Sequence, residues 1–176
     1  MTKFKGMVQI YTGQGKGKTT AALGLALRAA GHGLKTYIGQ FIKGQKYGEL
    51  KSLERLKPLV KVEQFGRNAF IHVNKNPDPQ DIQKAEEGLD SCLKAMLSGL
   101  FDIIVLDEIN VAMYFNLIRE ENVHDFLDQR PDHVEVILTG RHAPKSLIKR
   151  ADLVTDMTEI KHYYTQKVSA RDGIER

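Results

Sequence analysis

The sequence predicts an α/β fold with a mostly parallel central sheet, and three observations support this prediction. Short apolar runs alternate with amphipathic segments along the 176 residues. A glycine-rich turn joins the first apolar run directly to a helical segment rich in Ala and Leu. No internal repeat, low-complexity tract or Gly/Ser-rich linker divides the chain. We therefore expect a single domain that spans residues 1–176.

Six apolar runs have the character of buried strands. The run Phe101–Leu106 (FDIIVL) is the most apolar, so we expect it at the centre of the sheet. In chain order, the predicted strands are Met7–Thr12, Thr36–Phe41, Val60–Phe65, Phe101–Leu106, Val134–Leu138 and Leu153–Thr158.

Capping residues and helical spacing predict the helices between these strands. A helix over Lys18–Ala30 is terminated by Gly31 and Gly33. Asp78 caps a helix over Pro79–Leu97, with proline at the favoured first position. The other predicted helices are Tyr47–Leu56, Ile109–Leu117, Glu120–Gln129 and Lys145–Arg150. The stretch from residue 66 to 79 and the tail from residue 159 to 176 have no clear periodicity.

The composition narrows the class of protein. Hydrophobic residues make up 41% and charged residues 27%, which argues against disorder. The net charge of +4 permits an anionic partner without demanding nucleic acid. No apolar run approaches the roughly 20 residues that a membrane span needs, and no signal-peptide core is present, so we expect a cytoplasmic protein. Cys92 is the only cysteine, which excludes a disulfide framework and a multi-cysteine zinc site.

The glycine-rich turn has the features of a phosphate-binding loop, or P-loop. Its glycines let the backbone turn tightly and aim N–H groups inward, Lys18 can reach phosphates, and the Thr19 hydroxyl can ligate Mg²⁺. The first glycine position of the usual motif is Thr12, and Lys16 is an additional cation. The alternative is a glycine-rich turn without a ligand. The predicted ATP-binding residues here are Thr12, Gly13, Gln14, Gly15, Lys16, Gly17, Lys18, Thr19 and Thr20.

A second element completes the predicted nucleotide site. Asp107 and Glu108 follow the most apolar strand, as in the Walker B element that holds Mg²⁺ beside a P-loop. The predicted metal ligands are therefore Thr19 and Asp107 or Glu108. The alternative is that the two carboxylates only cap the next helix.

Further segments, in their order and spacing, closely resemble the ATP:corrinoid adenosyltransferase family. The resemblance runs from about Met7 to Glu175, and its most specific parts are the loop sequence, QFIKG and LTGR. The segments are Gly15–Ala22, Arg28–Gly33, Gln40–Gly44, Val105–Asn110, Arg130–Pro131, Leu138–Arg141, Ala151–Val154, Lys161–His162 and Gly173–Glu175.

The resemblance implies a RecA-like P-loop NTPase fold, with three α/β/α layers, in a homodimer. It implies transfer of the 5′-deoxyadenosyl group of ATP to the cobalt of a reduced corrinoid, with triphosphate as the leaving group and Mg²⁺ as cofactor. Such a transferase would serve adenosylcobalamin biosynthesis or salvage. It would need an electron donor such as a flavodoxin or a flavin reductase.

The resemblance also implies roles for individual residues. Lys18, Thr19, Glu108 and Arg141 would be catalytic, and Arg28, Gln40 and Arg141 would join the ATP-binding set. Phe41 and Phe70 would contact the corrinoid. Each of these has an ordinary alternative: an exposed helix arginine for Arg28, a surface salt bridge for Arg141, strand-end packing for Gln40 and Phe41, and core packing for Phe70.

Two other classes of function compete with adenosyl transfer. Another P-loop ATPase or kinase would use the same loop and release ADP. A nucleic-acid-binding module would explain the basic charge, but the Lys and Arg residues are dispersed among acidic ones and no nucleic-acid-binding motif is evident.

Overall fold

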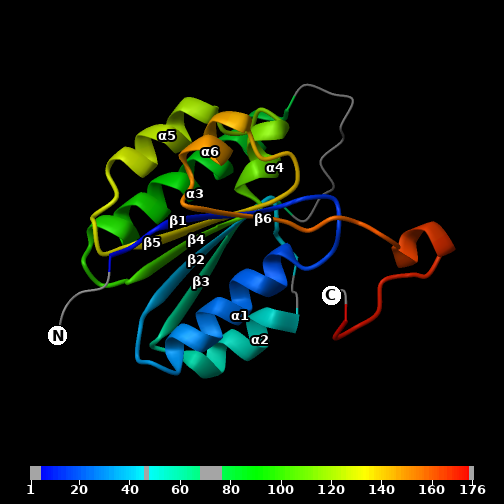
Figure 1. Ribbon diagram of the computed structural model, residues 1–176, viewed down its shortest axis with the longest axis horizontal. Coiled ribbons are helices and arrows are strands. Elements are labelled where there is room, and N and C mark those ends of the chain that lie inside the picture. Colours follow the sequence, from blue (N-terminus) through cyan, green and yellow to red (C-terminus); the bar gives the residue numbers. More distant parts are fainter. Residues whose placement is uncertain (1–4, 46–47, 68–76, 175–176) are drawn as a thin grey trace.

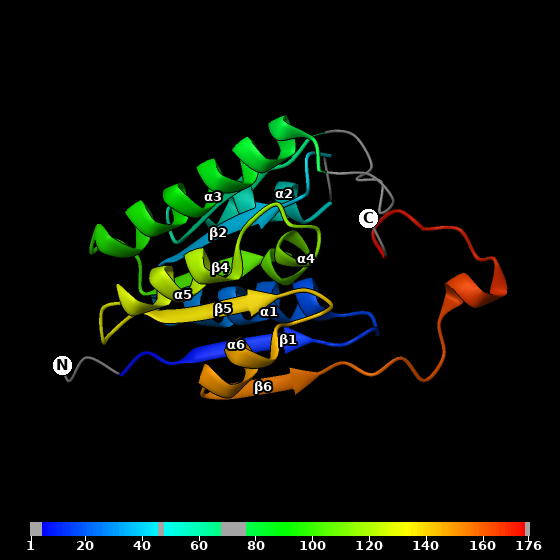
Figure 2. The same ribbon diagram turned by 90° about the horizontal axis from the view of Figure 1, so that it is seen from above.

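The computed structural model describes residues 5–45, 48–67 and 77–174. These residues form a six-stranded sheet in which every neighbouring pair of strands is parallel. The strand order is β3-β2-β4-β5-β1-β6, which Figure 2 shows from above. The strands are β1 (Val8–Thr12), β2 (Thr36–Phe41), β3 (Val60–Phe65), β4 (Ile103–Asp107), β5 (Glu135–Thr139) and β6 (Leu153–Asp156).

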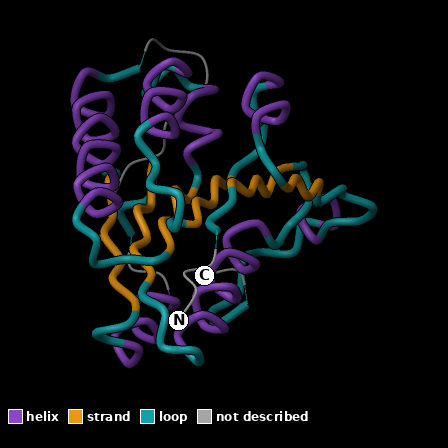
Figure 3. Tube along the Cα trace, turned by 60° about the vertical axis from the view of Figure 1, so that its left-hand side comes forward, coloured by secondary structure: helices purple, strands orange, loops and turns teal. Residues whose placement is uncertain are grey.

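Helices cover both faces of the sheet, giving three layers. The helices α1 (Lys18–Ala30) and α2 (Gly48–Leu53) lie on one face (Figure 1). On the other face lie α3 (Pro79–Leu97), α4 (Ile109–Tyr114), α5 (Glu120–Asp128) and α6 (Lys145–Arg150). Figure 3 shows the same helix–strand–helix layering from the side. Two short 3₁₀ helices are η1 (Glu54–Leu56) and η2 (Tyr163–Gln166).

The predicted fold class and the central position of the most apolar strand are confirmed. β4 lies between β2 and β5, and the predicted mostly parallel sheet is parallel throughout. β4 starts at Ile103 rather than at the predicted Phe101, because the Asp102 side chain folds back onto the chain before β2. The Asp102 carboxylate accepts a hydrogen bond from the Lys35 backbone N–H at 2.8 Å. The predicted helix that starts at Ile109 ends at Tyr114, just before Asn116 adopts a left-handed φ of 56°.

Two other elements differ from the prediction by two residues or more, whereas β1, α5 and β5 differ by one residue. The segment expected as one helix over Tyr47–Leu56 is α2 followed by η1, and Tyr47 itself lies outside the described residues. The last strand ends at Asp156 rather than at Thr158, because the chain there leaves the sheet edge and passes beside the P-loop.

Two apolar clusters hold the layers together, one on each face. Successive residues of β4 alternate between them: Ile104 packs with α3 to α6, whereas Val105 packs with α1. Because both faces are buried, the strands read as continuous apolar runs rather than alternating ones. The Cys92 thiol of α3 is fully buried against β2, and this burial raises its pKa well above the ordinary value.

All strands run the same way, so their carboxyl ends lie at one edge of the sheet. In open α/β sheets this edge is where ligands bind. The loops after β1, β2, β4 and β5 meet here, and the chain that leaves β6 continues past the same edge (Figure 2). In the part of the chain that the structure describes, no helix combines the length and apolar character required to cross a membrane.

Gly39 in β2 supplies a sharp test of the packing between the sheet and α3. A Cβ added at Gly39 would lie 2.4 Å from the Cys92 Sγ atom, inside the fully buried core. We expect Gly39→Ala to lower the free energy of unfolding by about 1–3 kcal/mol, the usual cost of overpacking. Urea denaturation followed by circular dichroism measures the change.

The matched control is Gly24→Ala in α1, where an added Cβ meets no atom within 4 Å. This change should instead raise the free energy of unfolding by about 0.5–1 kcal/mol, because alanine favours the helix. Equal stability of the two variants would contradict the packing described here.

Candidate functional site

The P-loop is shaped by glycines whose backbones other residues could hardly adopt. Gly13 and Gly17 have φ values of 98° and 118°, in the region that favours glycine. A Cβ at Gly13 would also collide with Asp156, the last residue of β6, and with Met157, the residue after it. The Gly15 N–H donates to the Met157 carbonyl at 2.6 Å, and this hydrogen bond links the P-loop to the chain beyond β6.

Lys18 begins α1 and points back over its own loop. Its Nζ donates to the carbonyls of Gly13 and Gly15, at 2.8 and 2.7 Å. The residue is only 7% exposed, and this burial lowers the pKa of its ammonium; Glu108 counteracts the shift and Arg141 adds to it. The ammonium thus lies on the inner side of the glycine-rich turn, where phosphates bind in P-loops.

Asp107, the last residue of β4, is the centre of a buried polar cluster. Its Oδ1 accepts hydrogen bonds from the hydroxyls of Thr19, at 2.9 Å, and Thr139, at 2.7 Å. Its Oδ2 accepts from Lys43 Nζ at 2.7 Å and from Gln40 Nε2 at 3.3 Å. The carboxylate therefore joins α1, β5, β2 and the loop after β2.

Glu108 adopts a left-handed backbone with a φ of 65°, and its N–H donates to the Thr139 hydroxyl at 2.9 Å. Its side chain makes no capping bond to α4, so the predicted alternative that it only caps the helix is wrong for Glu108. Burial and the neighbouring Asp107 raise the pKa of the Glu108 carboxyl, against the opposing effect of Lys43, Lys18 and Arg141. Glu108 is thus a half-buried acid surrounded by cations.

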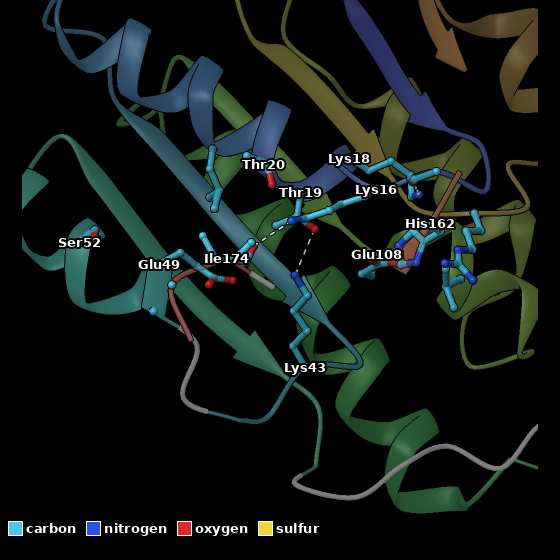
Figure 4. Close-up of a pocket in the computed structure, with 17 residues that line it drawn as sticks. Lys16, Lys18, Thr19, Thr20, Lys43, Glu49, Ser52, Glu108, His162 and Ile174 are labelled. Carbon is cyan, nitrogen blue, oxygen red and sulfur yellow. Dashed lines mark hydrogen bonds between the residues drawn. The ribbon is translucent and has the colours of Figure 1, made fainter. Parts of the chain in front are cut away.

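A cavity of about 780 Å³ opens at this edge of the sheet. Its walls come from the P-loop, the start of α1, the loop after β2, α2, the start of α4, the loop after β5 and the C-terminal segment (Figure 4). The lining residues are Gly15, Lys16, Gly17, Lys18, Thr19, Thr20, Leu23, Lys43, Gly48, Glu49, Ser52, Glu108, Val111, Arg141, His162, Gly173 and Ile174.

The structure brings most of the predicted site together. The predicted residues that line the cavity are Gly15, Lys16, Gly17, Lys18, Thr19, Thr20, Glu108 and Arg141. Thr12, Gly13 and Gln14 belong to the same loop without lining the cavity. Asp107 is 1% exposed and lies behind Lys43. Arg28 lies exposed in the last turn of α1, at the end of the helix away from the P-loop, and it does not line the cavity. Its predicted ATP contact stays a prediction.

The residues predicted to border the adenosine or the corrinoid are placed differently. Gln40 is fully buried and bonds Asp107 from behind the cavity. Phe41 is also fully buried, and its ring lies 6.1 Å from that of Phe65. Phe70 lies outside the described residues. The predicted corrinoid contacts of Phe41 and Phe70 stay predictions.

The sequence reasoning missed several cavity residues. Lys43, Glu49 and Ser52 come from the loop after β2 and from α2, and His162, Gly173 and Ile174 come from the C-terminal segment. The Ile174 carbonyl accepts a hydrogen bond from Lys16 Nζ at 3.0 Å (Figure 4). For Lys43, His162, Gly173 and Ile174 the available signal was the family resemblance of QFIKG, Lys161–His162 and Gly173–Glu175, but we gave these residues no ligand role. Glu49 and Ser52 lie in none of these segments.

The oxygen donors of the site fit a magnesium ion. The Thr19 hydroxyl and the carboxylates of Asp107 and Glu108 are hard donors, which Mg²⁺ prefers alongside water and substrate phosphates. No cluster of three or more His, Cys, Asp or Glu side chains that could hold a metal occurs among the described residues. A magnesium ion held by these oxygens would complete its coordination with water and substrate phosphates.

A phosphate-binding turn at the start of α1, facing a buried carboxylate at the end of the central strand, is the arrangement of P-loop nucleotide-binding proteins, and this chain is one of them. Comparison with known families narrows the class further. A family model described as ATP:corrinoid adenosyltransferase BtuR/CobO/CobP matches residues 4–176. The chain belongs to the ATP:corrinoid adenosyltransferase family.

Individual relatives agree with this placement. A protein of Sinorhizobium sp named corrinoid adenosyltransferase is 35% identical over 177 residues, which cover 99% of this chain and 82% of the relative. The corrinoid adenosyltransferase of Escherichia coli K12 is 32% identical and that of Salmonella typhimurium, named CobA, is 34% identical. Each of these two alignments covers 97% of this chain and 86% of the relative.

Thr139 provides a test of the polar cluster. Thr139→Val keeps the shape of the side chain, but it removes one donor from the buried Asp107 and leaves the Glu108 N–H without its acceptor. We expect the free energy of unfolding to fall by about 1–3 kcal/mol, the cost of unsatisfied buried polar groups. Urea titration measures the change.

Thr155→Val in β6 is the matched control, because this threonine is exposed at the sheet edge. Its effect should stay within about 0.5 kcal/mol, as for most surface substitutions. Indistinguishable midpoints for the two variants would refute the role given to the Thr139 hydroxyl.

Proposed function

We propose that the chain transfers the 5′-deoxyadenosyl group of ATP to the cobalt of a reduced corrinoid and releases triphosphate, in the formation of the vitamin B12 coenzyme. The observation that carries this proposal is the cavity at the carboxyl edge of the sheet, where the P-loop, Lys43 and Arg141 face one space. Family membership points to the same reaction, and the cavity offers a binding place for the nucleotide that the reaction uses.

The site suits a reaction in which the leaving group carries the negative charge. The Co(I) electron pair forms the bond to C5′, the C5′–O bond breaks, and its electron pair departs with the triphosphate. Co(I) is already a strong nucleophile, so no side chain has to remove a proton. The work left to the protein is to position C5′ and to stabilise the triphosphate, which preorganised cations and loop amides do well.

Named residues can divide this work. The amides of the P-loop and the Lys18 ammonium would bind the phosphate chain, with Lys16 and Arg141 at the cavity wall adding positive charge. The Thr19 hydroxyl with Asp107 or Glu108 would hold Mg²⁺, which supplies charge neutralisation of the phosphates when bound. Gln40 would contribute indirectly, by keeping the Asp107 carboxylate oriented from behind.

Several finer expectations belong to the same proposal. We expect one catalytic domain, a homodimer in solution and a cytoplasmic location, where an electron donor such as a flavodoxin or a flavin reductase supplies Co(I). The family resemblance supports these expectations, and the strongly reduced state of the cobalt calls for a reducing compartment. The natural corrinoid is left open among cobinamide, cobyrinic acid diamide and cobalamin.

Product analysis tests the proposal directly. The protein is incubated with Mg-ATP and chemically reduced cobalamin, and the products are identified by mass spectrometry. We expect inorganic triphosphate together with a corrinoid whose cobalt–carbon bond is cleaved by light. Release of ADP that does not depend on cobalt would overturn the proposal and favour an ATPase or a kinase.

Lys18→Ala gives the corresponding mutational prediction. Loss of the ammonium from the inner side of the P-loop should weaken ATP binding and lower turnover by about two orders of magnitude or more, as expected for a lost electrostatic contact to the leaving group. The control is Lys149→Ala, which removes an exposed lysine of α6 outside the cavity. Turnover of Lys18→Ala close to that of the control would show that the P-loop is not the active site.

A further inference from the structure

The Asp107 carboxylate already has a cation beside it, and that cation belongs to the chain. Lys43 Nζ forms an ion pair with Oδ2 at 2.7 Å, with side-chain exposures of 16% for Lys43 and 1% for Asp107. A carboxylate this deeply buried is costly without a positive partner. The ion pair therefore stabilises the site in the protein without nucleotide.

The Lys43 ammonium lies between two oxygen ligands of the predicted metal site. Lys43 Nζ also donates to the Thr19 hydroxyl oxygen at 3.2 Å (Figure 4). The ammonium therefore bridges this hydroxyl and the Asp107 carboxylate. In P-loop proteins, the threonine after the loop lysine and the Walker B aspartate hold Mg²⁺. The Lys43 ammonium thus occupies the place between two oxygens that fit the metal, and two cations cannot share that place.

The backbone before Lys43 is held in a costly conformation that aims the side chain there. Ile42 has a φ of 64°, which is unfavourable for a β-branched residue. A Cβ on Gly66 would lie 2.4 Å from the Ile42 carbonyl carbon, and the Ile42 N–H donates to the Phe65 carbonyl at 3.2 Å. Strain of this kind persists where the surroundings impose it, often at functional sites. Here it turns the chain at the end of β2 toward β4 and α1.

We propose that Lys43 is the resident cation of the metal position, and that magnesium bound to the nucleotide displaces it when the substrate enters. The inference rests on the proposed nucleotide site and adds an exchange of one cation for another. The Asp107 carboxylate then keeps a positive partner in both states. Lys43 lines the cavity on a flexible four-carbon stem, so the displaced ammonium faces the phosphates of the incoming nucleotide.

The consequence is that free metal competes poorly for the site, whereas metal carried by phosphates succeeds. Mn²⁺ in the absence of nucleotide is the probe, because its free concentration is measured directly by electron paramagnetic resonance. Removal of the ammonium in Lys43→Met exposes the Thr19 and Asp107 oxygens. We expect this variant to bind Mn²⁺ at least about ten-fold more tightly than the unmodified chain, because site affinity follows the uncompensated ligand charge.

Three companion variants make the result specific. Lys43→Arg keeps the positive charge and should bind Mn²⁺ like the unmodified chain. Lys16→Met removes a different cavity cation, whose Nζ donates to the Ile174 carbonyl, and should leave Mn²⁺ affinity nearly unchanged. The double variant Lys43→Met with Asp107→Asn should lose the gained affinity, which would locate the metal at Asp107.

Two outcomes would overturn the exchange. One is an unchanged Mn²⁺ affinity in folded Lys43→Met. The other concerns folding: if Lys43→Met unfolds without metal, millimolar Mg²⁺ should restore its circular dichroism, and failure to do so would show that the metal cannot replace the ammonium. Product analysis is independent of both readouts, so adenosylated corrinoid without a gain in Mn²⁺ binding rejects only the exchange. A gain without adenosylated corrinoid rejects only the proposed reaction.

Discussion

The buried carboxylate of Asp107 is the interaction on which the site depends. A charge that is almost wholly removed from water is tolerated only when it is paired and fully hydrogen-bonded. The donors to Asp107 come from α1, β5, β2 and the loop after β2, through Thr19, Thr139, Gln40 and Lys43. Satisfying one charge therefore fixes the start of the P-loop helix against two strands and a loop.

The order of the strands makes this convergence possible. β4 lies between β2 and β5, and β5 separates it from β1, whose carboxyl end begins the P-loop. The P-loop helix thus reaches Asp107 across a neighbouring strand, and Thr139 on that strand bonds both the Asp107 carboxylate and the Glu108 N–H. On the other side, β2 places Gln40 directly opposite Asp107 in register. Long-range pairing, rather than any local motif, builds the polar cluster.

This distinction explains what the sequence could and could not predict. Apolar runs and caps are local, so the strands, most helices and the central place of β4 were predicted. The differences arise where Asp102 bonds Lys35, where Asn116 turns left-handed, and where the chain after Asp156 bonds the P-loop. The P-loop and the Asp107–Glu108 pair have local signatures and were found. Lys43 lies in the family segment QFIKG, but no local pattern shows its role, because its partner is 64 positions away and becomes adjacent only through the strand order. Burial of Gln40 and Phe41 likewise depends on layers that periodicity does not reveal.

The two ends of the cavity wall differ in how deeply their residues are buried. The phosphate end is formed by strand ends and by the start of α1, where Lys18, Asp107 and Thr139 are buried and hydrogen-bonded. The opposite wall is the segment after β6, which is exposed along residues 158–174 apart from the half-buried His162. Few buried contacts mean a low free energy for local opening. A triphosphate bound at the buried end would therefore keep its position even when the exposed wall opens locally.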